Sequence, residues 1–350
     1  MPGSTAEDPR PSGPGRRRPA GPILWLLRRL GNAVLVVWVV ATFVFFALRV
    51  SGDPLEAILG GPGSQAGPEA VAEARSSYGL DRPLLVQYLV QLWRVATLQF
   101  GDSFARHRPV GPLVLENLSG TVVLAVAALV VAWLLAVGSA LLAATARGPI
   151  GRMAAAGLRA LELVATVMPQ FWLGAVLILV FAQHLHLLPA TSSGSGPGGL
   201  VLPVITLAVP VAGFLSQVSR DALLEADSAA FATTARSRGA GEVRVLLVHT
   251  LRHASLPALS LSGWAFGNLL SGAVVVEMLF ARPGLGRLLW EAAMGRDVPV
   301  VIGVVVVVAL LYILVLAVVD ALEPVIDPRL RGRRASAVRR ELSPETAVGS

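Results

Sequence analysis

The chain lacks two residue types entirely, because none of its 350 residues is a cysteine or a lysine. Without cysteine it can form no disulfide, no thiolate metal site and no cysteine nucleophile. Without lysine it cannot carry a Walker A loop, in which a lysine contacts the nucleotide phosphates. We therefore expect the chain to bind no cofactor of its own, and any ATP hydrolysis linked to it must come from another polypeptide.

Charge is also scarce. Only 15% of the residues are charged, 54% are hydrophobic, and the mean hydropathy is +0.68. Crossing a bilayer takes about 20 apolar residues. Stretches of that kind lie at residues 23–48, 119–145, 154–182, 201–224, 256–280 and 299–322. The sequence thus predicts an all-α, polytopic membrane protein with six transmembrane helices, in which residues 119–322 form the core. Pro203, Pro210 and Gly213 interrupt the fourth span and should kink it.

The arginines lie mainly in tails and between the spans. Residues 1–22 form a tail rich in Arg, Pro and Gly that cannot bury a core, and residues 323–350 form a second arginine-bearing tail. The loop at 183–199 has no basic residue. The positive-inside rule then predicts that both termini are cytoplasmic and that residues 49–118 are extracytoplasmic. This pattern fits membrane lipid as a partner and disfavours nucleic acid, which needs a basic surface with stacking aromatics.

The loop at residues 225–255 is the most informative part of the chain. Its arginines at 236, 238, 244 and 252 are too costly to bury in hydrocarbon, so it must lie in water. Phe231, Thr234 and Ala235 share one helical face, and Gly239 should end that helix. A second helix is predicted from Glu242 until Pro257 opens the next apolar span. A short glycine-capped helix at a membrane surface is suited to docking a partner.

This loop, FATTARSRG followed by HTLRHASLP, resembles the cytoplasmic coupling loop of binding-protein-dependent ABC importer permeases of the peptide/nickel subfamily. Further matches are GLDRP at 79–83, FWLG at 171–174, AVVVE at 273–277, PGLGRLL at 283–289 and DPRL at 327–330. The chain departs from the family pattern at Phe231, Thr233 and Arg238, where the family has tyrosine, arginine and lysine.

The resemblance implies a type I ABC importer permease fold and a pore-forming subunit that is not an enzyme. It also implies a place in the bacterial cytoplasmic (inner) membrane. The implied cargo is di- or oligopeptides, or a related small solute such as a nickel complex. The implied partners are a second permease subunit in a heterodimer, two ABC ATPase subunits and an extracytoplasmic substrate-binding protein. The residues expected to couple the chain to the ATPase are Phe231, Thr234, Ala235, Arg236, Arg238, Gly239 and Arg252. Phe231 would be the apolar anchor, with Arg236 and Arg238 as rim charges.

On the predicted outer side, residues 49–118 carry an amphipathic run from Leu84 to Leu98. This segment is either a contact for the binding protein or a lid over the helix ends. The triplet Gly101, Asp102 and Ser103 resembles the family element G-D-x-G-x-S without its second glycine, so it predicts only a tight turn.

A second candidate site follows the fifth span and comprises Glu277, Pro283, Gly284 and Gly286. The proline and glycines predict a rigid turn before a short helix. The turn is either an external gate or a purely structural element. Glu277 is either functional or paired with Arg282 or Arg287. In the third span, Glu162 either lines the pathway or, as we favour, pairs with Arg159.

No metal site or catalytic constellation is expected. His184 and His186 are two residues apart, which places them on different faces of a helix and disfavours joint metal binding. His249 and His253 have a four-residue spacing that can bind zinc, but His249 belongs to the loop motif, so we expect a structural role. G-x-S-x-G and H-E-x-x-H motifs are absent. The competing hypothesis is an ion-gradient-driven secondary transporter without an ATPase, which would call for midplane ionisable residues.

Overall fold

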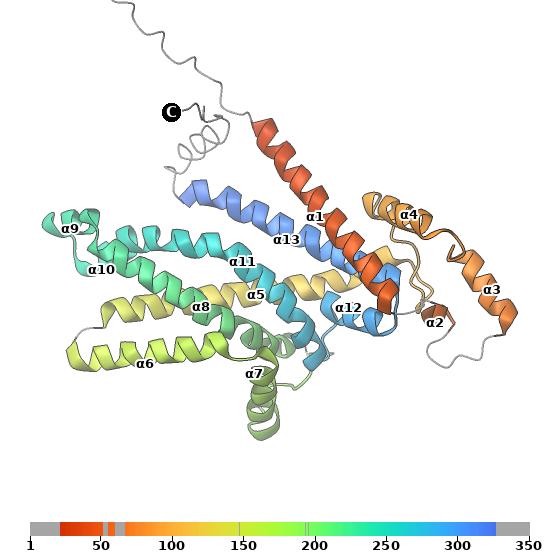
Figure 1. Cartoon of the computed structure of the whole chain (residues 1–350). Helices are drawn as coiled ribbons and strands as arrows, with labels where there is room; N and C mark the ends of the chain where they lie inside the picture. Colours follow the sequence, from red (N-terminus) through yellow and green to blue (C-terminus); the bar gives the residue numbers. More distant parts are fainter. Residues whose placement is uncertain are drawn as a thin grey trace, which may run out of the picture.

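The computed structural model describes residues 22–51, 55–59, 67–146, 148–192, 194 and 196–326. Throughout these residues the chain folds into helices and contains no strand, so the predicted all-α class is confirmed (Figure 1). The predicted tails at 1–22 and 323–350 lie mostly outside the described residues.

Five long helices contain an apolar stretch that could cross a membrane. They are α1 (Pro22–Ser51), α5 (Val110–Thr145), α8 (Val201–Ser228), α11 (Leu251–Leu279) and α13 (Val298–Ile326). They correspond to five of the six predicted spans. Helix α5 begins directly after Pro109, well before predicted residue 119, because Glu116 and Asn117 end the apolar stretch but do not end the helix.

The predicted third span, 154–182, is not one straight helix. Helix α6 (Gly148–Val167) is followed by α7 (Gln170–Leu177) and a π-helical turn, η1 (Ile178–His184), and the two parts are bent by 109°. The break falls at Met168 and Pro169. A residue before proline is disfavoured in the α conformation, which explains why the helix ends there. Within the described residues, six spans are therefore reached only if this bent pair counts as one.

Helix α8, in contrast, is continuous despite its prolines. It follows a short 3₁₀ turn, η2 (Gly196–Leu200). Pro203 lies in its first turn, where the missing N–H has no intrahelical partner, and Pro210 lies inside. Gly213 marks a close approach to α6, because a Cβ there would lie 2.6 Å from the carbonyl oxygen of Glu162. This glycine thus serves packing between helices.

The core lies between α5, α8 and α11. Alanines 125, 128, 132 and 136 of α5 are fully buried and recur at helical spacing against leucines of α8 and α11. Small residues let helix backbones approach closely, which favours association in a lipid environment, where the hydrophobic effect between helices is weak.

Short helices occupy the two ends of the molecule. At one end lie α2 (Leu55–Ile58), α3 (Pro68–Ser77), α4 (Leu84–Ala96) and α12 (Leu285–Met294). At the opposite end lie α9 (Ala230–Ser237) and α10 (Glu242–Arg244), the latter continuing through a π-helical turn, η3 (Val245–Thr250), into α11 (Figure 1). The amphipathic run predicted from Leu84 is thus confirmed as helix α4.

The tight turn predicted at Gly101 to Ser103 lies slightly later, at residues 104–106, while Gly101 has a left-handed φ of +83° and Asp102 forms a bridge with Pro109. This loop is held by Asp297, which is 2% exposed and precedes α13. The Asp297 carboxylate accepts hydrogen bonds from the Ser103 hydroxyl (2.5 Å) and from the backbone N–H groups of Phe104 (3.0 Å) and Ala105 (3.2 Å). A buried carboxylate with three donors fixes this loop to the helices beneath it.

Candidate functional site

Helix α9 forms because the chain breaks on both sides of it. Ala229 is extended (ψ 154°) and separates α9 from α8, and Gly239 adopts a left-handed φ of +82° at its other end. The N–H groups of Gly239 and Ala240 donate to the carbonyls of Arg236 (2.9 Å) and Ala235 (3.1 Å). These bonds satisfy carbonyls that the helix end would otherwise leave free. The predicted glycine stop is confirmed.

The second half of the predicted loop needs a correction. The helix that starts at Glu242 does not stop at Pro257, because α10, η3 and α11 run on as one path and Pro257 lies inside α11. Proline is tolerated inside a transmembrane helix when neighbouring groups satisfy the freed backbone carbonyl.

One face of α9 is open. Phe231, Thr234, Ala235 and Arg238 line a surface hollow of about 500 Å³ together with Ala240 and Arg244, which we call the α9 hollow. Phe231 is 38% exposed, whereas Ala232 on the other face is fully buried. Four of the seven predicted coupling residues thus lie together on one exposed face, with an aromatic ring among them.

Arg236 belongs to a different arrangement. Its guanidinium donates to the Asp227 carboxylate (2.5 Å) and backbone carbonyl (3.0 Å) in the last turn of α8, and to the Glu242 carboxylate (3.2 Å) at the start of α10. The hydrogen bond to Asp227 is the main reason that the pKa of Arg236 is raised above its usual value. This side chain joins three helices, a role that the sequence did not indicate.

Arg252 lies apart from the α9 hollow. It is exposed in the first turn of α11, and its backbone carbonyl accepts a hydrogen bond from the Ser255 hydroxyl (2.9 Å). The side chains of His249 and His253 lie outside the described part of the chain.

The second candidate site is buried. The Glu277 carboxylate, fully inaccessible near the end of α11, accepts hydrogen bonds from the Thr121 hydroxyl of α5 (2.6 Å) and from the Arg287 backbone N–H (3.0 Å). The Thr121 oxygen in turn accepts the Leu285 N–H (2.8 Å). Glu277 and Thr121 thus bind the first N–H groups of α12, where a negative charge is favoured.

Glycines allow the turn to lie close to α5 and α11. A Cβ on Gly284 would lie 2.3 Å from the Glu277 carboxyl carbon, and one on Gly286 would lie 2.5 Å from the Cα of Val274. A Cβ on Gly120 of α5 would lie 2.2 Å from the carbonyl oxygen of Pro283. A larger residue would force the backbone apart at Gly120 and Gly286 and would displace the Glu277 carboxylate at Gly284, so the geometry favours the structural interpretation of this turn.

The expected ion pair of Glu277 is not formed with either arginine in the described structure. The Arg287 side chain pairs instead with Glu291 (2.8 Å). Arg282 keeps a buried Nε without a hydrogen-bond partner, and burial lowers the pKa of its guanidinium although the nearby Glu277 opposes this. The backbone of Arg282 does contribute, because its N–H donates to the Glu277 carbonyl (2.8 Å).

The prediction that Glu162 pairs with Arg159 was wrong. The Glu162 carboxylate pairs with Arg220 of α8, and both side chains are buried, whereas Arg159 is exposed. A buried pair of this kind depends on its geometry, because either charge alone would be costly. It joins α6 to α8.

Comparison with known proteins decides the family. A family model described as the inner membrane component of binding-protein-dependent transport systems matches residues 136–332. The corresponding model for the N-terminal part of such components matches residues 23–125. The chain belongs to this family. The resemblance seen in the coupling loop is thereby confirmed, and the protein is a permease of the ABC importer type.

Relatives of this permease match it almost from end to end. A protein of Brucella abortus (strain 2308), whose name describes a peptide transport system permease, is 34% identical over 316 residues, covering 87% of this chain and 98% of its own. The dipeptide transport system permease of Escherichia coli (strain K12) is 33% identical over 342 residues, covering 89% and 99%.

A solved structure supports the fold. A chain of the MetNI methionine ABC transporter in an inward-facing conformation matches with a TM-score of 0.52 and 16% identity, covering 61% of this permease and 96% of that chain. At this identity the likeness concerns the fold alone. It confirms the type I importer permease architecture that the sequence resemblance implied.

Proposed function

We propose that this permease forms, with a second permease chain, the translocation pathway of an ATP-driven importer of di- or oligopeptides. Two ATPase subunits would bind and hydrolyse the ATP, and an extracytoplasmic binding protein would deliver the cargo. Both termini and α9 would lie in the cytoplasm. Peptide as cargo is supported by the names of relatives that match nearly the whole chain.

The observation that carries this proposal is the connection of α9 to the core. Arg236 holds α9 to the last turn of α8 and to the start of α10, which continues into α11. Helices α8 and α11 pack against each other and against α5 in the main core. A force applied to α9 therefore reaches both core helices through short, directional contacts.

The exposed face of α9 is suited to receive that force. Phe231 offers an apolar ring at the α9 hollow, and Arg238 and Arg244 surround it with positive charge. Aromatic anchors with polar rims are the usual energetic centre of protein interfaces. We infer that this face docks against an ATPase subunit, and that closure of the ATPases shifts the permease between inward- and outward-facing states.

Helix α11 offers a face for the pathway or for the second permease chain. Its exposed residues recur every three or four positions, at Ser260, Trp264, Asn268, Ser271 and Val275. Polar side chains within an apolar span are disfavoured against lipid and usually face protein or water. This row therefore points to the partner permease or to the translocation pathway rather than to the bilayer.

Reconstitution tests the proposal directly. The permease would be co-expressed with its partner subunits, purified in mild detergent and placed in proteoliposomes with labelled dipeptide outside. We expect an ATPase subunit to co-purify and uptake to require both ATP inside and the binding protein outside. Uptake that persists with an ATPase whose Walker A lysine is replaced, but collapses when the ion gradient is dissipated, would instead establish a secondary transporter.

A further inference from the structure

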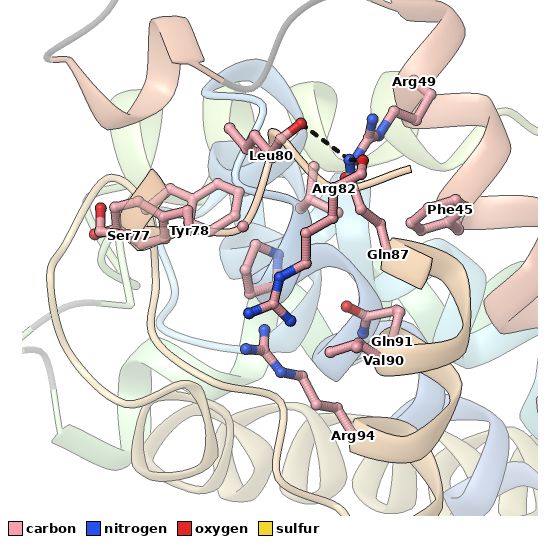
Figure 2. A pocket seen from close by; sticks show the side chains of 14 residues that line it. Phe45, Arg49, Ser77, Tyr78, Leu80, Arg82, Gln87, Val90, Gln91 and Arg94 are labelled. Carbon is pink, nitrogen blue, oxygen red and sulfur yellow. Dashed lines mark hydrogen bonds between the residues drawn. The ribbon is translucent and has the colours of Figure 1, made fainter. Parts of the chain in front are cut away.

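A small pocket lies at the end of the molecule opposite α9. It has a volume of about 130 Å³ and lies between the end of α1, the α3–α4 turn, α4 and the start of α13. Three arginines line it, Arg49, Arg82 and Arg94, together with Gln87 and Gln91, and no acidic residue from the described part of the chain does. We call it the arginine pocket (Figure 2).

Two of the three guanidinium groups have no acidic partner among the described residues. Among the described residues, neither the Arg82 nor the Arg94 guanidinium has an ion pair or a hydrogen bond, whereas Arg49 donates to Gln87. Figure 2 shows the Arg82 and Arg94 groups turned toward each other. Like charges at close range repel, so this arrangement favours an anion between or beside them.

Gln91 adds an independent sign of a missing ligand. Its side chain is 93% buried, since only 7% of the residue is exposed, and its Nε2 has no hydrogen-bond partner. A buried donor without an acceptor is costly. The neighbouring Gln87 is fully used, because its Nε2 donates to the carbonyls of Leu80 (3.0 Å, dashed in Figure 2) and Arg82 (2.7 Å). The lining therefore includes two guanidinium groups and one amide N–H group without acceptors among the described residues, a set of donors that suits an oxyanion.

The pocket also lies beside an apolar surface. Helix α4 exposes Leu85 (67%), Leu89 (55%) and Trp93 (71%) in one row at spacings of four residues. The Tyr88 hydroxyl fixes α4 along the membrane-spanning α1, through hydrogen bonds with Trp38 (3.1 Å) and Thr42 (2.8 Å). An amphipathic helix tied to a transmembrane helix is placed to lie in the membrane interface.

We propose that the arginine pocket binds the phosphate of an anionic phospholipid headgroup, while the exposed row of α4 lies among the upper parts of the acyl chains. Arg82, Arg94 and the Gln91 amide would donate to the phosphate oxygens. The pocket is large enough for one headgroup phosphate but too small for a folded segment of a partner protein. Bound lipid would fix α4 against α1 and the start of α13.

Native mass spectrometry of the purified full-length permease tests this. Phosphatidylglycerol and phosphatidylcholine would be titrated against the wild type, the pocket variant Arg82→Gln/Arg94→Gln, and the control Arg75→Gln/Arg108→Gln. The control removes the same charge from the same end but outside the pocket. We expect the pocket variant alone to lose at least about tenfold in affinity for phosphatidylglycerol, since two charge-assisted hydrogen-bonding groups are lost.

Size-exclusion profiles and circular dichroism would show that all variants are folded. Equal phosphatidylglycerol binding by the pocket variant and the control would overturn the proposal. Displacement of the lipid by millimolar inorganic phosphate would also overturn it, because the ligand would then be a free anion. Unchanged lipid binding with weakened capture of the substrate-binding protein would assign the pocket to an acidic protein partner instead.

Discussion

The two candidate sites are built in opposite ways. The surface around α9 is open, and its aromatic ring, Phe231, is 38% exposed. The turn at Glu277 is closed, with its carboxylate fully buried and three glycines pressed against backbone or carboxyl atoms. Both sites resemble motifs of the family in sequence. Only the open site can meet another protein without unfolding part of itself, so the comparison assigns contact to α9 and rigidity to the turn.

The open and the closed site should respond differently to substitution. Substitutions at the closed turn should lower stability and reduce uptake only as folded protein is lost. Substitutions at the open surface should leave stability unchanged and reduce uptake per folded molecule. The expected loss of stability decreases from Gly120→Ala to Phe231→Asp.

Gly120→Ala should have the largest effect. The added Cβ would lie 2.2 Å from the carbonyl oxygen of Pro283, so α5 and the turn must separate. Overpacking of this kind costs about 3 kcal/mol when the neighbour is backbone. Thermal unfolding of the detergent-solubilised protein measures it. Gly138→Ala is the matched control in the same helix, because no atom lies within 4 Å of its Cβ, and it should be neutral or slightly stabilising. Equal melting temperatures for both variants would refute the close approach.

Glu277→Gln should follow, at about 2 kcal/mol. Glutamine can still accept from Thr121, but its NH₂ group would face the Arg287 N–H, which loses its acceptor. The control is Glu291→Gln, which breaks exposed ion pairs with Arg106 (2.6 Å) and Arg287 and should cost little. Uptake per folded molecule should stay normal in both. A normal melting temperature with lost uptake for Glu277→Gln would make this turn a gate rather than a structural element.

Arg236→Gln should affect stability less and coupling more. The variant loses the ion pairs that hold α9 to α8 and α10, so the docked helix can move without its neighbours. We expect ATP-dependent uptake to fall, but by less than about tenfold, because partly exposed ion pairs contribute modestly. Arg238→Gln removes the same charge two residues away without breaking an ion pair in the described structure. If both variants lowered uptake equally, the charge of α9 would matter rather than its attachment.

How much of the fold and of the candidate sites could be predicted depended on how far apart the interacting residues lie in the sequence. The α9 helix and its glycine stop were predictable, because helix face and cap both arise within ten residues. The same local reasoning failed for Glu162. It favoured Arg159 three residues away, whereas the partner is Arg220 on another helix. Nothing in a single sequence states which arginine a fold brings close.

The effects of two prolines on their helices were mispredicted for a related reason. Pro257 lies inside α11, and Pro169, which received no attention in the sequence, marks the 109° bend in the third span. Whether proline ends a helix depends on whether neighbouring groups satisfy the freed carbonyl, which is a tertiary property. The exposed row on α11 was hidden likewise, because the helix is apolar on several faces and only packing shows which face is left open.

Phe231→Asp should have the smallest effect on stability and separates the two sites most sharply. The ring is partly exposed at the α9 hollow, so its replacement should change the free energy of unfolding by less than about 0.5 kcal/mol. A carboxylate in an apolar docking pocket is costly, so ATPase binding and uptake should be lost. Thr233→Asp adds the same charge to the same helix outside the hollow and should retain both. Both variants place the same charge at an exposed position of the same helix, so a difference between them can come only from the face of α9 that is changed. Equal uptake by the two variants would count against docking at the α9 hollow.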